Sequence, residues 1–302
     1  MKKTLITRRV AILAAASLSF LAACGGSSSD SSKASDTTVA ASPGNGKKIL
    51  SLSPTATEML YAIGAGDQVV AVDSLSNYPT EAADKVTKIS AFEPNAEAIL
   101  GYSPDIVLIS NDMNKITEQL KTAKPDITVW TGAMANTIDD VYAQITDLGK
   151  VTGHDTEAAA LIAKMKTDLA AATEGVTAPE GASYYYELDN TYYSLTSNTF
   201  VGSLLKSTGI ANIADGVQAG NDWPQLNAES IIKSNPSVIF LADTKCCQQD
   251  AKAVSARAGW NGIDAVKNAR VVALDDDIAS RWGPRIVDLV KQMVAAVASL
   301  AK

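Results

Sequence analysis

The sequence predicts an α/β protein made of two lobes with parallel sheets, joined by helices. Strand-like apolar runs alternate with helix-like segments on both sides of the centre of the chain, which is typical of parallel α/β sheets. Between them, residues 137–175 contain neither a strand pattern nor a proline. The segment 95–110 is also nearly repeated at 227–242, 132 residues later, which indicates that one structural unit occurs twice in the chain.

Residues 1–23 are typical of an export signal. Basic residues precede "VAILAAASLSFLAAC", an Ala-rich apolar run that is too short to span a membrane. Its end, Leu-Ala-Ala-Cys, resembles the lipobox of bacterial lipoproteins, which implies cleavage before Cys24 and acylation of that residue. A plain secretory signal is the alternative. The pair Arg8-Arg9 leaves both the Sec and the twin-arginine export routes open.

Residues 24–46 are rich in Gly, Ser, Asp and Thr and have almost nothing to bury, so we expect a disordered tether. A lipid on Cys24, a tether and a folded body would place the protein on the outer face of the cytoplasmic membrane.

The first lobe is predicted over residues 47–136. Its opening strand, "KKILSLSP", stops at Pro54, and "TATEMLYAIGAG" reads as a helix that begins with a Thr55–Glu58 capping box. The further expected elements are a strand at 68–73, a loop at 74–82, a short helix from Asn95, a strand at 105–110, a helix at 115–123 and a strand at 127–130.

Two helices are predicted over residues 137–175. The first covers "TIDDVYAQITDLGKVTG", and the second covers "HDTEAAALIAKMKTDLAAATEG", with Asp155 or Thr156 as its cap and Gly175 as its end. At 1.5 Å per residue, a helix of about 20 residues spans about 30 Å, the width of a small domain. We therefore expect the second helix to join the two lobes.

The second lobe is predicted over residues 176–302, where the alternation of strands and helices resumes. The expected elements are strands at 183–189 and 191–196, a helix at 200–209, the second repeat with its helix and a strand at 237–242, a helix at 251–257, a strand at 270–275 and a final helix at 283–301.

Each copy of the repeat, "NAEAILGYSPDIVLIS" and "NAESIIKSNPSVIFLA", has a purely structural explanation. Asn is a good N-cap, Glu in the first turn suits the positive end of a helix, and Pro ends the helix before a buried strand. On spacing alone, Glu97 and Glu229 therefore need no function.

Charge and motifs narrow the classes of function. The chain has 26 basic and 33 acidic residues, and removal of residues 1–23 leaves 22 basic ones, so an acidic surface argues against nucleic acid as a partner. The single histidine, His154, and the lack of a P-loop, a GxGxxG after the first strand and a GxSxG elbow argue against an enzyme. A hydrolase that uses carboxylates alone is the remaining enzymatic alternative.

Cys246 and Cys247 are adjacent. A vicinal disulfide is strained, because neighbouring Cα atoms lie about 3.8 Å apart and ordinary bridges need roughly 4.4–6.8 Å. In an oxidising compartment such a bridge and two separate thiols are both open alternatives. A metal site is disfavoured, because two thiolates cannot fill a tetrahedral shell and no histidine lies nearby.

Several segments in the same order resemble the class III substrate-binding proteins of bacterial ABC importers, which bind cobalamin, ferric siderophores or haem. These segments are "LSLSPTATEMLYAIGAGDQVVAVDSLSNYP", the two repeats, "WPQLNAE" and "SRWGPRIVDLV", and the resemblance covers residues 48–302. It implies two Rossmann-like lobes joined by a single long helix, with the ligand in the cleft. It also implies that Glu97 and Glu229 dock a monomeric receptor on a permease dimer with its ATPase subunits.

The resemblance also implies which residues face the cleft. By position these are Ser53, Pro54, Thr55, Tyr78, Phe92, Trp223 and Arg281. Arg281 would grip an anionic ligand while Arg285 is structural; the alternative is that both pair with Asp275, Asp276 or Asp277 nearby. Cobalamin binders of this type carry Trp where this chain has Ala91 and Ser110, a departure that weakens the case for cobalamin itself. A tyrosine among Tyr184–Tyr186, Tyr192 and Tyr193 could face a metal, although β-propensity explains this cluster.

The sequence thus predicts a lipid-anchored receptor that delivers a metal chelate to an ABC permease, with no cofactor and no metal ligands of its own. A ferric siderophore and a corrinoid are the two leading cargoes. A haem receptor of the same family, or a lipoprotein interaction module without a transport role, are the alternatives.

Overall fold

A computed structural model describes residues 44–301 of the chain. The predicted export signal, the acylation site Cys24 and nearly all of the predicted tether lie outside the described residues. Of the tether's last residues, Asn45 donates a side-chain hydrogen bond to the Val151 carbonyl at 2.9 Å. No helix within residues 44–301 is long and apolar enough to cross a membrane.

The first lobe is built on a four-stranded parallel sheet in the order β2-β1-β3-β4. Its strands are β1 (Ile49–Leu52), β2 (Val69–Val72), β3 (Ile106–Ile109) and β4 (Thr128–Thr131). The central strands β1 and β3 are fully buried, as expected for continuous apolar runs covered on both faces. Their register pairs Ile49 with Ile106.

The helices of the first lobe connect these strands. They are α1 (Pro54–Ala62), the 3-10 turn η1 (Ala65–Gln68), α2 (Thr80–Ala83), α3 (Ala96–Leu100), η2 (Met113–Lys115) and α4 (Ile116–Ala123). The predicted Thr55–Glu58 capping box is wrong. Ser53 caps α1 by accepting a hydrogen bond from the Ala56 N–H, Pro54 occupies the first turn, and Glu58 has distant partners described below.

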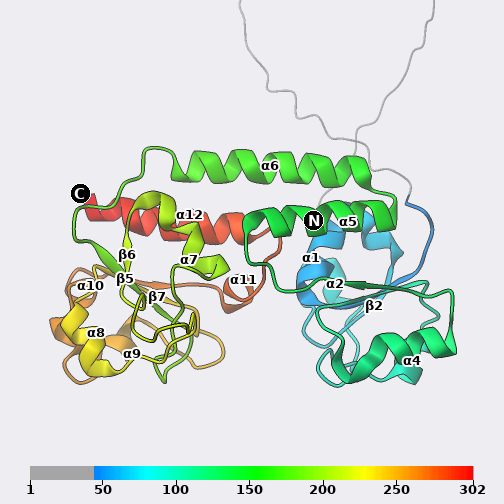
Figure 1. Cartoon of the computed structure of the whole chain (residues 1–302), viewed down its shortest axis with the longest axis horizontal. Coiled ribbons are helices and arrows are strands. Elements are labelled where there is room, and N and C mark those ends of the chain that lie inside the picture. Colours follow the sequence, from blue (N-terminus) through cyan, green and yellow to red (C-terminus); the bar gives the residue numbers. More distant parts are fainter. Residues whose placement is uncertain (1–43, 302) are drawn as a thin grey trace, which may run out of the picture. The chain divides into compact units, whose positions relative to one another are not determined.

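Two helices follow, α5 (Ile138–Thr152) and α6 (Asp155–Thr173). A capping box between Thr137 and Asp140 starts α5, and Gly153 in the left-handed conformation ends it. The cap of α6 is His154 rather than Asp155 or Thr156, and its side chain makes no capping bond. In Figure 1, α6 runs alongside both α5 and α12 (Ile286–Ala298), and these are its main packing partners.

The second sheet repeats the topology of the first, in the order β6-β5-β7-β8. Its strands are β5 (Ser183–Glu187), β6 (Ala211–Asn212), β7 (Val238–Leu241) and β8 (Val271–Ala273), all parallel. The strand predicted at 191–196 does not join this sheet and makes only an isolated antiparallel bridge between Tyr193 and Gln225. The short edge strand β6 was not predicted.

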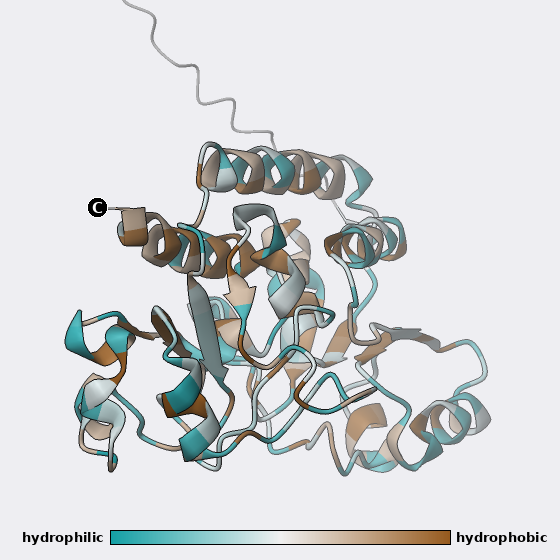
Figure 2. Cartoon of the chain, turned by 60° about the vertical axis from the view of Figure 1, so that its left-hand side comes forward, coloured by the Kyte–Doolittle hydropathy of each residue, from teal (hydrophilic) through white to brown (hydrophobic). Residues whose placement is uncertain are grey.

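The remaining elements of the second lobe are mostly short. They are α7 (Phe200–Leu204), η3 (Lys206–Thr208), α8 (Ala228–Ser234), α9 (Ala251–Ser255), η4 (Trp260–Gly262), α10 (Asp264–Lys267), α11 (Asp276–Ala279), α12 and η5 (Ser299–Ala301). The final helix α12 buries a broad apolar face, and the helix next to the C terminus is mostly apolar in Figure 2.

The near-repeat occupies the same place in both lobes. Asn95 caps α3 and Asn227 caps α8, each accepting a hydrogen bond at 2.9 Å from the N–H three residues on. The strands that follow, β3 and β7, are the third in their sheets. The repeated sequence segment therefore forms the same helix–strand unit in both lobes.

Each sheet has one face in a core of its own and one in a common core. The outer face of the first sheet packs with Ile99 and Leu120, and that of the second sheet with Ile231 and Trp260. The inner faces share a core with α5, α6 and α12, to which Met293 belongs. The two lobes are therefore joined by packing as well as by the chain.

Candidate functional site

A cavity of about 370 Å³ lies where connections that follow the strands come together. Its lining includes Met134 after β4, Leu188 after β5, Trp223 after β6, Ala242 after β7 and Trp282 after β8 and α11. The carboxyl ends of parallel strands are where ligand sites of open α/β sheets form. The cavity is therefore the first candidate for a ligand site.

Exposed apolar side chains gather in the same kind of connection. Among residues 44–301, Trp223 is 43% exposed and Met134 is 58% exposed, although both line the cavity. We use the name apolar rim for the exposed large apolar residues of the strand-to-helix connections together with Phe92, between α2 and α3, and Met113, the first residue of η2. The residues in the connections are Leu75, Tyr78, Met134, Tyr193, Val217 and Trp223. Of this set, Met134 and Trp223 line the cavity, so exposed apolar side chains are present at the candidate ligand site itself.

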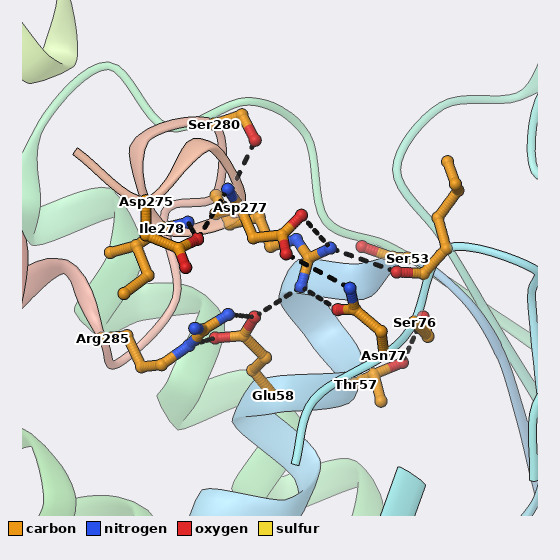
Figure 3. Close-up of polar contacts among 12 residues, drawn as sticks. Ser53, Thr57, Glu58, Ser76, Asn77, Asp275, Asp277, Ile278, Ser280 and Arg285 are labelled. Atoms are coloured by element: carbon orange, nitrogen blue, oxygen red, sulfur yellow. Dashed lines mark hydrogen bonds and ion pairs between the residues drawn. The ribbon is translucent and has the colours of Figure 1, made fainter. Parts of the chain in front are cut away.

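An ion cluster joins the two lobes. Glu58 on α1 is buried, and its carboxylate accepts hydrogen bonds from Arg285 at 2.8 and 2.5 Å and from Arg281 at 2.9 Å. Figure 3 shows Glu58 and Arg285 facing each other across the boundary between α1 and the start of α12. The partners are 223 and 227 residues apart in sequence, so these bonds fix the first lobe against the second.

Further polar bonds surround this cluster. Arg281 also binds Asp277 at 3.0 Å and the side-chain oxygen of Asn77 at 2.9 Å, and Asp277 accepts a hydrogen bond from Lys245 at 2.8 Å. Burial acts to raise the pKa of Asp277. The hydrogen bonds from Lys245 and Asn77 and the charge of Arg281 outweigh this effect, so the pKa lies below its ordinary value. The basic residues of the cluster therefore already have carboxylate partners.

Tyr78 contacts this cluster through Arg285. The Arg285 guanidinium lies over its ring at 4.0 Å from the centroid, a cation–π contact. Tyr78 and Arg285 line a second cavity of about 640 Å³ between α1, α6 and α12. This cavity is separate from the one that holds Trp223.

The structure brings together only some of the residues predicted to face the cleft. Trp223 and Arg281 line the 370 Å³ cavity. Phe92 belongs to the exposed apolar rim and lines neither cavity. Pro54 opens α1, and Ser53 and Thr55 are buried.

Two of the predicted residues have partners within the protein. Ser53 lines neither of the two cavities, and its hydroxyl caps α1 and accepts a hydrogen bond from Ser110 at 2.8 Å. Arg281 lines the cavity, but its guanidinium is bound by Glu58 and Asp277 and is therefore not free to bind an anion. The alternative, pairing with nearby aspartates, holds for Arg281, which binds Asp277. The partner that both arginines share is Glu58.

Some lining residues were not found from the sequence. Met134, Leu188, Phe200 and Trp282 all contribute apolar surface to the cavity. For Met134 and Leu188 the available signal was their place, because an apolar residue soon after a predicted parallel strand lies at the carboxyl edge of the sheet. Phe200 opens α7 and Trp282 follows α11, so this signal does not reach them. Among residues 44–301, no group of three or more His, Cys, Asp or Glu side chains is arranged to hold a metal ion.

The predicted docking residues take matching positions. Glu97 lies in the first turn of α3 and Glu229 in the first turn of α8, and both are exposed. They are therefore available to a partner at equivalent places on the two lobes.

A second buried cluster lies behind the cavity wall formed by Leu188 and Ala242. Glu187 is buried and binds Arg257 through two bonds of 2.6 and 2.5 Å. The neighbouring Asp243 is also buried, and its carboxyl oxygens receive no hydrogen bond. Burial, and then the negative charge of Glu187, raise the pKa of Asp243 to about 7.

Known proteins resemble this chain in sequence and in fold. The family model "Periplasmic binding protein" matches residues 49–278. The uncharacterized ABC transporter substrate-binding lipoprotein YvrC of Bacillus subtilis is 34% identical over 269 residues, covering 87% of this chain and 82% of that protein. The cobalamin-binding protein of Halobacterium salinarum is 30% identical over 259 residues, covering 83% and 69%. The structure of the periplasmic vitamin B12-binding protein BtuF of Vibrio cholerae superposes with a TM-score of 0.68 at 27% identity, covering 86% and 99%.

We expect Glu58→Gln to destabilise the protein strongly, because it leaves two arginines at a buried site without their shared counter-charge. Breaking a buried ion pair costs about 3 kcal/mol, equivalent to a fall of about 6–12 °C in melting temperature for a body of this size. Calorimetry measures the melting temperature of the variant. Glu180→Gln, which changes an exposed carboxylate, is the control. Equal melting temperatures for the two variants would show that the cluster does not support the fold.

We expect Asp243→Asn to raise stability at pH 8 and to leave it nearly unchanged at pH 4. The folded protein keeps the Asp243 proton up to about pH 7, whereas the unfolded chain releases it near 3.8. Stability is therefore lost as pH rises through this window, and the amide, which needs no proton, avoids roughly 1 kcal/mol or more of that loss.

Urea unfolding at several pH values measures this slope, with the exposed Asp126→Asn as the control. A variant with the same pH dependence as the parent would contradict the raised pKa.

Proposed function

This chain belongs to the periplasmic binding protein family, and we propose that it captures a corrinoid in the 370 Å³ cavity and its apolar rim and delivers it to an ABC permease. The family consists of solute-binding components of importers, so the chain acts by binding and not by catalysis. The observation that carries the choice of cargo is the neutralisation of the cavity's arginine by carboxylates.

The charges of the cavity disfavour an anionic cargo. Arg281 is the one basic side chain among the described lining residues of the cavity. It already forms ion pairs with Glu58 and Asp277. A ferric tris-catecholate or the propionates of haem need free cationic donors. Taking Arg281 from its pairs to supply them would leave the buried Glu58 with Arg285 alone and would break the bond to Asp277. Breaking largely buried ion pairs is costly. A cargo of low net charge avoids this cost.

The chemistry of the lining favours a large, flat, amide-bearing cargo. Trp223, Phe200 and Trp282 offer aromatic surface, which buries much area at a small loss of side-chain entropy. Asn136 and Asn198 place amide groups among these rings. A corrin ring, which is apolar on its faces and carries amide groups at its edge, matches both features. Because it exceeds the cavity, we infer that the apolar rim covers the remainder.

Cobalamin binders of this type carry Trp where this chain has Ala91 and Ser110. Those two aromatic side chains are therefore missing from this chain. Ser110 is engaged with Ser53, and Ala91 packs against the core of the first lobe. In our proposal the aromatic contacts come from the second lobe instead, through Trp223 and Trp282. The cobalamin-binding relative from Halobacterium salinarum supports the same cargo.

A tryptophan-fluorescence titration tests the cargo. We expect saturable quenching by cyanocobalamin at micromolar or lower concentration, and weaker or no binding of haemin and of a ferric tris-catecholate. Trp223→Ala should weaken cyanocobalamin binding at least about tenfold, which is 1.4 kcal/mol. Tyr102→Ala, an exposed aromatic residue in a helix-to-strand connection, is the control.

Preferential binding of haemin or of the ferric chelate would replace the corrinoid by one of these cargoes. Binding of none of them would favour a lipoprotein interaction module without a transport role.

We also propose that Glu97 and Glu229 dock the receptor on the permease, and that a lipid on Cys24 holds it at the outer face of the membrane. The two exposed carboxylates at equivalent places suit a two-fold symmetric partner with basic side chains. The name of the Bacillus subtilis relative, a lipoprotein, supports the anchor.

The double variant Glu97→Gln/Glu229→Gln should lower uptake of labelled cobalamin by cells at least about tenfold and leave the affinity of the purified protein for cyanocobalamin unchanged. The exposed Glu118→Gln is the matched control. Normal uptake by the double variant would rule out docking through this pair.

A further inference from the structure

The turn after β7 carries two adjacent cysteines that the proposed function does not use. Cys246 is exposed and Cys247 is half-buried, and both are free thiols. Their Sγ atoms lie 2.7 Å apart, closer than two sulfur atoms that are not bonded normally approach. The fold therefore holds the two sulfur atoms against each other.

One carboxylate holds the backbone of this turn. The N–H groups of Thr244, Lys245 and Cys246 donate to the carboxylate of Asp276 at 2.8, 2.8 and 3.0 Å. These three successive bonds fix the direction of the chain up to the first cysteine. The sulfur atoms consequently meet without further ordering of the backbone.

We propose that Cys246 and Cys247 form a reversible thiol–disulfide exchange site that reacts with disulfides, either of small thiols or of proteins. One thiolate of the pair attacks a sulfur atom of the incoming disulfide, forms a mixed disulfide and releases the first thiol. The neighbouring thiolate then attacks the cysteine sulfur of the mixed disulfide and releases the second thiol. The chain loses two protons and two electrons, and the incoming disulfide is reduced to two thiols.

The geometry makes this bridge labile rather than structural. Adjacent Cα atoms lie about 3.8 Å apart, below the roughly 4.4–6.8 Å of ordinary disulfides. Strained and exposed disulfides are the more easily reduced ones. Partial desolvation of its sulfur atom, and then the contact with Cys247, hold the pKa of Cys246 above its ordinary value, so this group is a thiol at neutral pH. Exchange that starts from Cys246 therefore accelerates as pH rises.

The peptide between the cysteines is also held in the turn. Its N–H, that of Cys247, donates to the Asp243 carbonyl at 3.2 Å. The same turn is bound to Asp276, and the next residue, Asp277, binds Arg281 of the ion cluster. The two cysteines therefore lie next to the ion cluster that joins the lobes.

A mass measurement on one peptide tests the proposal independently of the cargo. The full chain is incubated with oxidised glutathione at mildly alkaline pH, free thiols are blocked with N-ethylmaleimide, and trypsin releases "CCQQDAK", residues 246–252. We expect the oxidised peptide to be lighter than the unlabelled dithiol peptide by two hydrogen atoms and to carry no label. After reduction it should carry two labels.

Two comparisons make the test specific to the fold. The urea-unfolded chain should give several-fold less ring and more glutathione adduct, because the pair is then not held together. Cys247→Ser should retain glutathione on Cys246, because no second thiol can expel it. A folded chain that keeps two labels or glutathione after oxidation, equal ring yields with and without urea, or an unreactive Cys246 in the variant would each overturn the proposal.

Discussion

The arrangement of the two lobes depends on one buried carboxylate, that of Glu58. The lobes have separate sheets, and each could close its own outer core. Glu58 on α1 binds two arginines near the start of α12. Glu58 is buried there, and the side chains of Arg281 and Arg285 are only 9% and 17% exposed. A buried charge is tolerated only with partners, so the lobes are held where the three groups meet. The cavity lies beside this meeting point, because Arg281 also lines it.

The same pairing determines the chemistry of the cavity. Arg281 would be the natural ligand for an anion, yet its charge is already used to hold the fold. Binding an anion there would compete with the lobe contact, whereas an uncharged cargo leaves the contact intact. The rim of exposed apolar residues fits this second situation. Structure and specificity are therefore coupled through one ion cluster in our proposal.

The sequence predicted the α/β class, the lobe–helix–lobe order and nearly all central strands, because long apolar runs, capping residues and proline stops are local signals. It failed where a local rule competed with a distant partner. Glu58 fits a capping box with Thr55, but its true partners are 223 and 227 residues away. Residues 191–196 have strand propensity, yet β6 takes the place beside β5 that a further strand would need. In the site, Trp223 was found through a resemblance, whereas Met134 and Trp282 required knowledge of which connections meet.

A crystal structure with cyanocobalamin would test the coupling of fold and specificity most directly. We expect the corrin ring against Trp223 and Trp282 in the cavity lined by Met134, with the bonds between Glu58 and the two arginines intact. A ligand bound elsewhere, or an Arg281 side chain that has left Glu58 to bind the cargo, would contradict the role that we assign to this carboxylate.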